Sequence, residues 1–96
     1  MAEASATALT RTVTVVNRRG LHARAAAKFV TLAERFGASV EVERDGQSVS
    51  ARSIMGLMML GAGQGSTLDL HADGWDAKEA LDALTALVEA GFNEGD

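Results

Sequence analysis

The hydrophobic residues of the chain change their spacing from segment to segment, and this change constrains the fold more than any other feature. Polar and apolar residues alternate in four short segments, as in half-buried strands: residues 12–15, 40–43, 48–51 and 67–72. Apolar residues recur every three to four positions in three others, as in helices that bury one side: residues 26–36, 54–60 and 77–88. The order βαββαβα predicts an α+β open-faced sandwich, in which a four-stranded, mainly antiparallel sheet carries three helices on one face.

Short polar and glycine signals mark where these elements start and stop. Residues 45–46 are Asp-Gly between two alternating segments, which is a strong signal for a β-hairpin. Gly37 is a natural C-cap for the first helix. Asp76 and Glu79 have the spacing of a capping box for the last helix, and Trp75 before them is expected to pack as a hydrophobic staple. The strand side chains expected to face the core are Val13, Val15, Leu68, Leu70 and Ala72.

Length and composition favour one small domain without a cofactor. The chain has 96 residues, so we expect a single domain over residues 1–96, with residues 1–9 as a flexible tail. It has no Cys, which excludes a disulfide, and its two His residues lie far apart, so we expect no metal site. A net charge of −4 argues against a nucleic-acid surface, and no apolar run is long enough to span a membrane. We therefore expect a monomeric cytoplasmic protein.

One loop carries residues suited to phosphoryl chemistry. Residues 17–24 read Asn-Arg-Arg-Gly-Leu-His-Ala-Arg and lead into the first helix. Gly20 allows a tight turn, and His22 follows it where the first free N–H groups of the helix should lie. These N–H groups and the positive end of the helix dipole favour an anion, and Arg24 adds a guanidinium. The pattern predicts an imidazole that takes and releases a phosphoryl group. The alternative is a turn glycine beside an ordinary surface histidine.

The second helix is apolar on all sides, which a domain of this size cannot bury. At about 100° per residue, Leu57 and Leu60 fall on one face and are expected in the core. Ile54, Met55 and Met58 fall on another face and should form an exposed apolar patch that binds partner proteins. Methionine suits such a surface because its side chain is flexible and polarizable. The alternative is that the methionines fill irregular gaps in the core.

Three more residues bear on the candidate site. Ser53 precedes the apolar helix, where it either caps the helix or, as a phosphorylation site, would place a dianion beside the patch. Lys28 lies four residues after Arg24, shares its helix face and is expected to contact partners. His71 falls on the outer face of its strand and is expected to be an exposed residue without a role in transfer.

Two motifs occur together in the chain: residues 20–24, Gly-Leu-His-Ala-Arg, and residues 53–61, Ser-Ile-Met-Gly-Leu-Met-Met-Leu-Gly. At this separation they resemble the HPr family, the histidine phosphocarriers of the bacterial phosphotransferase system. The resemblance implies that His22 accepts a phosphoryl group through Nδ1 from phosphorylated Enzyme I, which phosphoenolpyruvate charges, and passes it to a IIA protein or domain. It also implies that Arg24 is the active-site arginine. Ser53 would be the regulatory serine on which a kinase and a phosphorylase act in some bacteria. Such a protein is a carrier with a phosphohistidine intermediate, not a free-standing enzyme.

The chain departs from this family at Ala25, where the family usually has a proline that presets the first helical turn. Alanine is a good helix former, so we expect the helix to form with a less rigid start. Residues 17–19, the alanine-rich first helix and the Gly91-Phe92 ending look more like the nitrogen-related branch, which regulates rather than imports sugar. Phe92 itself is expected to fold back on the core. Two alternative functions remain. One is a non-catalytic regulatory partner that acts through phosphorylated Ser53 and the apolar patch, and the other is a small-molecule-binding α+β module.

Overall fold

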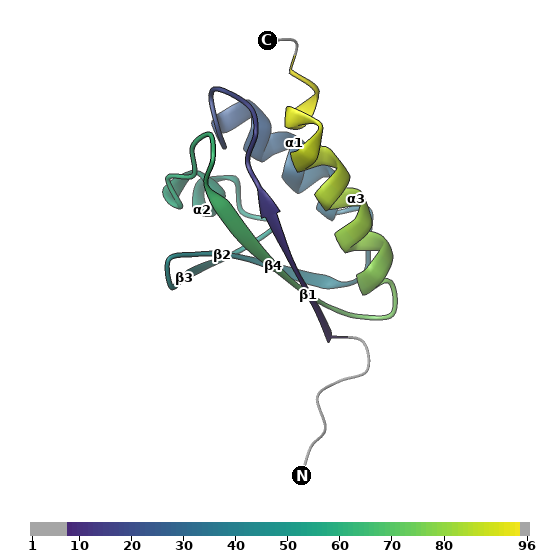
Figure 1. Cartoon of the computed structure of the whole chain (residues 1–96). Helices are drawn as coiled ribbons and strands as arrows, with labels where there is room; N and C mark the ends of the chain where they lie inside the picture. Colours follow the sequence, from purple (N-terminus) through teal and green to yellow (C-terminus); the bar gives the residue numbers. More distant parts are fainter. Residues whose placement is uncertain (1–7, 95–96) are drawn as a thin grey trace.

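Four strands form one antiparallel sheet in the order β1-β4-β2-β3 (Figure 1). The computed structural model describes residues 8–94, and residues 1–7 and 95–96 lie outside the described part of the chain. In chain order the elements are β1 (Ala8–Thr14), α1 (Ala23–Ala33), β2 (Ser39–Arg44), β3 (Gln47–Ser50), α2 (Ile54–Met59), β4 (Thr67–Asp73), α3 (Ala77–Glu89) and the short 3-10 helix η1 (Gly91–Asn93). Residues 8 and 9 of the expected tail therefore belong to a strand.

The three α-helices lie on one face of this sheet (Figure 1). α3 packs on β1 and β4, and α1 contacts both α2 and α3. The core fills the space between helices and sheet, and its largest fully buried side chains include Phe29, Phe92, Leu57, Leu68, Leu70, Leu81 and Leu84. The predicted open-faced α+β sandwich is confirmed. The strand residues expected to face inward are buried as well: Val13, Val15, Leu68, Leu70 and Ala72.

The predicted hairpin joins β2 to β3. Arg44 pairs with Gln47, so the loop consists of Asp45 and Gly46 alone. These two residues have φ angles of 52° and 80°. Two consecutive positive φ angles are what a type I′ turn requires, and its twist matches the twist of the flanking strands.

The first helix ends earlier than predicted. α1 stops at Ala33, with Glu34 as its C-cap, so Gly37 does not cap it. Phe36 still packs against the core, which is why the apolar spacing continues past the end of the helix. Gly37 instead leaves room for Trp75, because a Cβ at this position would lie 2.9 Å from Trp75 Nε1. Trp75 itself is 84% exposed, so the predicted hydrophobic staple is wrong.

Asp76 precedes α3 but does not cap it with its side chain. Its carboxylate accepts hydrogen bonds from the backbone N–H groups of Gly37, at 2.9 Å, and Ala38, at 2.8 Å. Asp76 is buried, and a buried carboxylate needs strong donors. The turn between α1 and β2 supplies these donors, so the predicted capping box is wrong, and Asp76 ties this turn to the start of α3.

Two loops meet at one end of the molecule, near the point where η1 ends (Figure 1). The loop after β1 is joined to the loop before β4 by hydrogen bonds from Val15 N–H to Ser66 O and from Gly65 N–H to Val15 O, both 2.8 Å long. Leu21 N–H donates to Ala62 O at 3.0 Å. This arrangement presents the start of α1 at the end of the molecule. Within residues 8–94, no helix combines the length and the apolar character needed to cross a bilayer.

Candidate functional site

A glycine turn sets the approach of the chain to α1. Gly20 has a φ of +66°, and a Cβ at this position would lie 2.4 Å from Ala62 O. Any other residue would strain the backbone and collide with the loop before β4. Asn17 closes the turn, because its Nδ2 donates to Gly20 O at 2.8 Å. The turn thereby delivers His22 to the start of the helix.

His22 is the N-cap residue of α1, with φ −75° and ψ 177°. Its ring nitrogen Nδ1 accepts hydrogen bonds from the backbone N–H groups of Arg24, at 3.2 Å, and Ala25, at 3.4 Å. A ring nitrogen that accepts a hydrogen bond carries a lone pair, so in the neutral ring the proton belongs to Nε2. The structure thus places His22 at the helix start, as the sequence predicts, with Nδ1 turned toward the positive end of the helix dipole.

The other ring nitrogen of His22 contacts a residue that sequence reasoning missed. His22 Nε2 is hydrogen-bonded to Oε2 of Glu94, the residue that follows η1, and both side chains are only 14% exposed. Asn17 Nδ2 donates to the other carboxylate oxygen, Glu94 Oε1, at 3.1 Å. These hydrogen bonds, above all the one from His22, hold the pKa of the Glu94 carboxyl below its usual value. The site therefore contains a carboxylate in addition to the predicted imidazole and guanidinium.

Glu94 reaches His22 because the chain turns back after α3. Gly91 and Phe92 have positive φ angles of 64° and 58°, and Phe92 is fully buried, as the sequence predicts. Lys28 Nζ donates to Phe92 O at 2.7 Å, so this ammonium group binds the backbone of the same molecule. Gly91 and Phe92 are the one sequence signal that could have pointed to Glu94, because they predict a chain that returns to the core.

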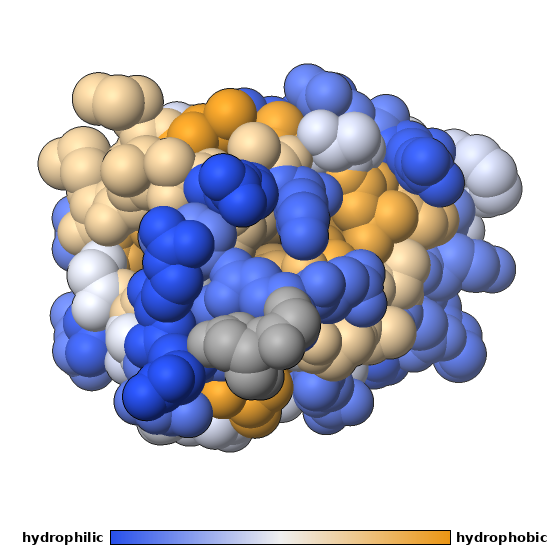
Figure 2. Space-filling model, turned by 90° about the horizontal axis from the view of Figure 1, so that it is seen from above, coloured by the Kyte–Doolittle hydropathy of each residue, from blue (hydrophilic) through white to orange (hydrophobic). Residues whose placement is uncertain are grey.

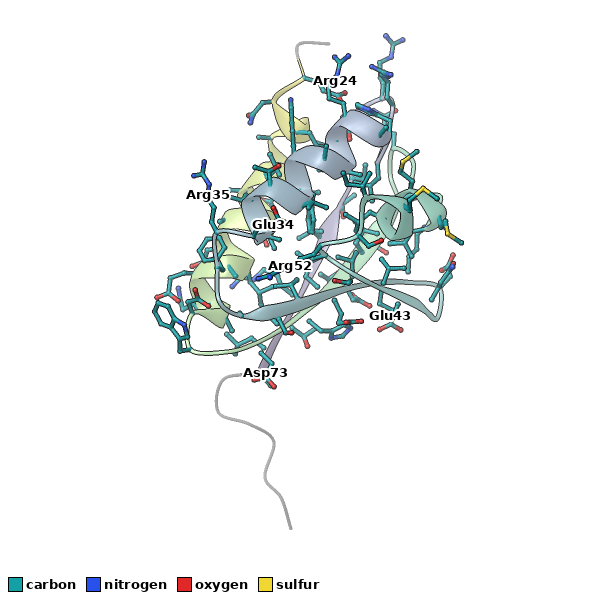
Figure 3. All side chains as sticks on the ribbon, turned by 180° about the vertical axis from the view of Figure 1, so that it is seen from behind. Arg24, Glu34, Arg35, Glu43, Arg52 and Asp73 are labelled. Carbon is teal, nitrogen blue, oxygen red and sulfur yellow. The ribbon has the colours of Figure 1, made fainter. Side chains whose placement is uncertain are left out.

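Arg24 projects outward from the start of α1 (Figure 3). Its guanidinium makes no ion pair or hydrogen bond with any residue from 8 to 94. Together with Lys28 it lines an open groove of about 450 Å³ beside α1. The lining of this groove also includes Thr31, Leu32, Arg35 and Leu87. The charged side chains of this lining are all basic. Within the described chain, the Arg24 guanidinium is therefore available to an anion bound near His22.

Ala25 does not prevent the helix from forming. α1 begins at Ala23, and the Ala25 side chain is fully buried. Because alanine keeps its backbone N–H group, it can donate to Nδ1 of His22, which a proline cannot do. The expected helix is confirmed, and the N–H group of Ala25 adds a donor at the site.

α2 presents an exposed apolar face, as its sequence predicts. Ser53 is its N-cap residue, and the Ser53 hydroxyl accepts a hydrogen bond from Gly56 N–H at 2.9 Å. Leu57 and Leu60 are buried as predicted. The apolar patch consists of four exposed side chains: Ile54 (39%), Met55 (72%), Met58 (43%) and Met59 (66%). The helical wheel left Met59 unassigned. In the end-on view, hydrophobic atoms gather on the side where α2 lies, beside hydrophilic atoms at the centre (Figure 2).

His71 lies on the face of the sheet that the helices leave open. Its Nδ1 is 3.1 Å from Thr10 Oγ1, and its Nε2 is 2.9 Å from Glu43 Oε1. The side chain is 41% exposed and points away from the core, as the strand alternation predicts. Over the described range, 8–94, no group of three or more His, Asp or Glu side chains is arranged to hold a metal ion.

Known proteins with similar sequences and structures identify the family of this chain. The family described as "PTS HPr component phosphorylation site" matches residues 9–90. The phosphocarrier protein HPr of Cupriavidus necator is 52% identical over 88 residues, which cover 92% of this chain and 99% of that protein. The phosphocarrier protein NPr of Shewanella violacea is 48% identical over 92% of this chain and 97% of that protein. The crystal structure of HPr-C-His from Thermoanaerobacter tengcongensis has a TM-score of 0.87 at 44% identity, covering 92% of this chain and 99% of that one. The chain therefore belongs to the HPr family, the phosphocarrier proteins of the phosphotransferase system.

Proposed function

We propose that this protein carries a phosphoryl group on Nδ1 of His22, taking it from phosphorylated Enzyme I and passing it to a IIA protein or domain. The observation that carries the proposal is the pair of backbone N–H groups, from Arg24 and Ala25, that point at Nδ1. A nitrogen that accepts such bonds has the lone pair that attack on phosphorus requires. Family membership supports the same role, because the relatives are phosphocarrier proteins.

In the transfer step, the Nδ1 lone pair forms a bond to phosphorus while the bond between phosphorus and the donor breaks. The electron pair of the broken bond leaves with the donor. The N–H groups at the start of α1, which Nδ1 gives up, then become donors to the phosphoryl oxygens, as helix N-termini are for phosphates. Arg24 neutralises the charge on these oxygens through charge-assisted hydrogen bonds. Phosphoryl transfer depends mainly on positioning and electrostatics, so a small carrier suffices when its partner completes the site.

The apolar patch on α2 is the surface that we assign to these partners. It is exposed and rich in methionine, which suits a surface that binds several proteins in turn. Lys28 and Arg24 would contribute positive charge on the neighbouring α1 face. A phosphate on Ser53, added by a kinase and removed by a phosphorylase, would sit at the border of the patch and oppose docking. These partners imply a cytoplasmic location.

Phosphorylation with labelled phosphoenolpyruvate and Enzyme I tests the central claim. His22→Ala should abolish acid-labile label, because the acceptor nitrogen is gone. His71→Ala is the matched control, since it removes the other histidine of the chain, and it should keep the label. Label that persists in His22→Ala would refute the assignment. If the parent protein took no label from Enzyme I and was labelled only by a serine kinase, on Ser53, the regulatory-partner function would replace the carrier function.

The docking surface has its own test, which exchanges an apolar for an acidic side chain at two exposed positions. Met55→Glu in the patch should raise the KM for phosphorylation by Enzyme I about tenfold or more, which corresponds to about 1.4 kcal/mol of lost binding. Trp75→Glu, at an apolar residue outside α2 that is also mostly exposed, is the control and should leave KM unchanged. Ser53→Asp should also raise KM, with little change in melting temperature. Equal effects of the two Glu variants would show that the patch is not the docking surface.

A further inference from the structure

The hydrogen bond between Glu94 and His22 belongs to an arrangement that is held at several points. Phe92, two residues before Glu94, is fully buried, which anchors the turn that follows α3. The carbonyl oxygen of Phe92 is bound by Lys28 Nζ at 2.7 Å, which attaches the turn to α1. Asn17 then holds the carboxylate itself, through the 3.1 Å bond from Nδ2 to Oε1. The carboxylate is therefore aimed at His22 by the core, by α1 and by the loop after β1.

The same amide group links the carboxylate to the turn that delivers the imidazole. Asn17 Nδ2 donates both to Glu94 Oε1 and to Gly20 O. The two ring nitrogens of His22 consequently face opposite chemistries, with backbone N–H donors at Nδ1 and an acceptor-only carboxylate at Nε2. Both contacts favour the same tautomer, with the proton on Nε2. A carboxylate that holds an imidazole in this way also stabilises the imidazolium that forms during catalysis, as in the Ser-His-Asp triad.

We propose that Glu94 is a positioning residue for phosphoryl transfer, which holds the His22 proton on Nε2, keeps Nδ1 as the nucleophile and stabilises the charge that the ring acquires. The proposal rests on the proposed function of His22 and deepens it. As Nδ1 bonds to phosphorus, the donor's bond to phosphorus breaks and its electron pair stays with the donor. The proton stays on Nε2, so the phosphorylated ring carries a positive charge opposite the Glu94 carboxylate.

The same contact serves the second transfer. When an acceptor attacks the phosphorus, the electron pair of the N–P bond returns to Nδ1. The ring then leaves as neutral imidazole, because it has kept its proton on Nε2. A carrier must release its phosphoryl group as readily as it takes it, and the Glu94 carboxylate stabilises the charged ring common to both steps.

Glu94 does not block the nucleophilic nitrogen, because it contacts Nε2, whereas Nδ1 contacts the backbone N–H groups at the start of α1. A residue that blocked Nδ1 would compete with the phosphoryl donor, so its removal would speed transfer. A positioning residue has the opposite effect, since its removal slows transfer. The sign of the change in rate therefore separates the two roles.

Glu94→Gln tests the proposal, because it keeps the size of the side chain and removes its charge. Glu89→Gln is the matched control: it makes the same change at an exposed residue that lines the same small hollow as Asn17 and Glu94, without a hydrogen bond to His22. Glu94→Gln should lower kcat/KM for phosphorylation by Enzyme I about 10- to 100-fold, the range for partners that orient histidines at metal sites. Glu89→Gln should leave it unchanged. Glu94→Asp, which keeps the charge, should retain more of the rate than Glu94→Gln.

Nitrogen-15 NMR of the unphosphorylated His22 ring gives a readout that does not depend on transfer. In the parent and in Glu89→Gln the proton should reside on Nε2, and in Glu94→Gln a larger share should move to Nδ1. The proposal would be overturned if Glu94→Gln transferred at the parent rate or faster. It would also be overturned if the His22 ring of the parent were protonated on Nδ1. In both cases the carrier function would still stand. A parent that takes no phosphoryl group on His22 would instead overturn the carrier function, and the ring spectra would still show whether Glu94 sets the tautomer.

Discussion

His22 and His71 lie in different regions of the molecule, and each pairs its Nε2 with a glutamate. His22 contacts Glu94 at the end where α1 begins, and His71 contacts Glu43 on the open face of the sheet. The difference lies at the second ring nitrogen. Nδ1 of His71 meets the Thr10 hydroxyl, whereas Nδ1 of His22 meets two backbone N–H groups of a helix start. A histidine–glutamate pair is therefore common to a surface contact and a candidate site, and the helix start distinguishes them.

The charged side chains around the two histidines also differ: they are acidic around His71, whereas a basic side chain lies beside His22. In the sheet, His71 stands opposite Glu41, and the next row pairs Glu43 with Asp69. An approaching phosphoryl group, which is negatively charged, would be repelled there. Beside His22 the Arg24 guanidinium extends toward solvent without a partner among residues 8–94. His22 thus combines an imidazole, two backbone donors and a free cation within the described chain, whereas His71 has the imidazole without the other two.

The largest effect is expected from removing that cation. Arg24→Ala should lower kcat/KM for phosphorylation about 100-fold, the usual effect of losing one group that binds transferring charge, and should change the melting temperature little. Arg24→Lys should restore only part of the rate, since an ammonium lacks the planar pair of donors. Arg35→Ala, at the other end of α1 (Figure 3), is the control and should behave like the parent. Equal losses in Arg24→Ala and Arg35→Ala would show that the basic surface as a whole matters, not the position beside His22.

A smaller effect is expected in the pH dependence of stability. In the folded protein, the hydrogen bond from His22 is the largest cause that lowers the pKa of Glu94 from its ordinary value of 4.5. A group whose folded-state pKa is depressed stabilises the protein above its unfolded-state pKa, and this stability is lost as pH falls through the folded-state pKa. Parent protein should therefore melt at a higher temperature than Glu94→Gln at neutral pH, and the gap should close as pH falls below 4.5. Thermal melts of both proteins and of Glu89→Gln check this, and a gap that persists in acid would contradict it.

The smallest effect is expected from Ala25→Pro, which removes a single hydrogen bond to His22. Proline removes the Ala25 N–H group that donates to Nδ1 of His22 at 3.4 Å, while position 25 lies in the first turn of α1, where proline is tolerated. The free energy of unfolding should change by less than about 1 kcal/mol, since the restricted unfolded chain offsets the lost bond. The Nδ1 resonance of His22 should shift, and that of His71 should not. An unshifted His22 resonance would mean that the Arg24 N–H group alone binds Nδ1.

The features that the sequence predicts correctly are those decided by neighbours along the chain. Alternation places Val13 and Leu70 in the core, and the Asp45-Gly46 pair forms its hairpin because both residues tolerate positive φ. The helix start at His22 follows from Gly20 and the helical spacing after it. The exposure of Met59 could not be predicted in this way. In a helix that is apolar on all sides, the spacing of apolar residues does not show which of them the rest of the fold will bury.

The features that the sequence does not predict depend on partners far along the chain. Glu94 lies 72 residues from His22, and no periodicity connects the two. Asp76 has the local spacing of a helix cap, yet its carboxylate binds N–H groups 38 and 39 residues away, because the fold buries it against them. Phe36 continues an apolar spacing after α1 has ended, since a turn can keep a side chain on the core as a helix does.

The separation of the two ends of the described chain has a practical consequence for experiments. β1 starts at the end of the molecule opposite to the one where η1 stops, and Glu94 follows η1 directly (Figure 1). An affinity tag or surface linker attached ahead of Ala8 leaves His22 facing the solution. The same attachment made directly after Glu94 would begin beside His22 and crowd the proposed transfer site. Immobilisation ahead of Ala8 therefore suits sensor surfaces and single-molecule measurements of partner binding.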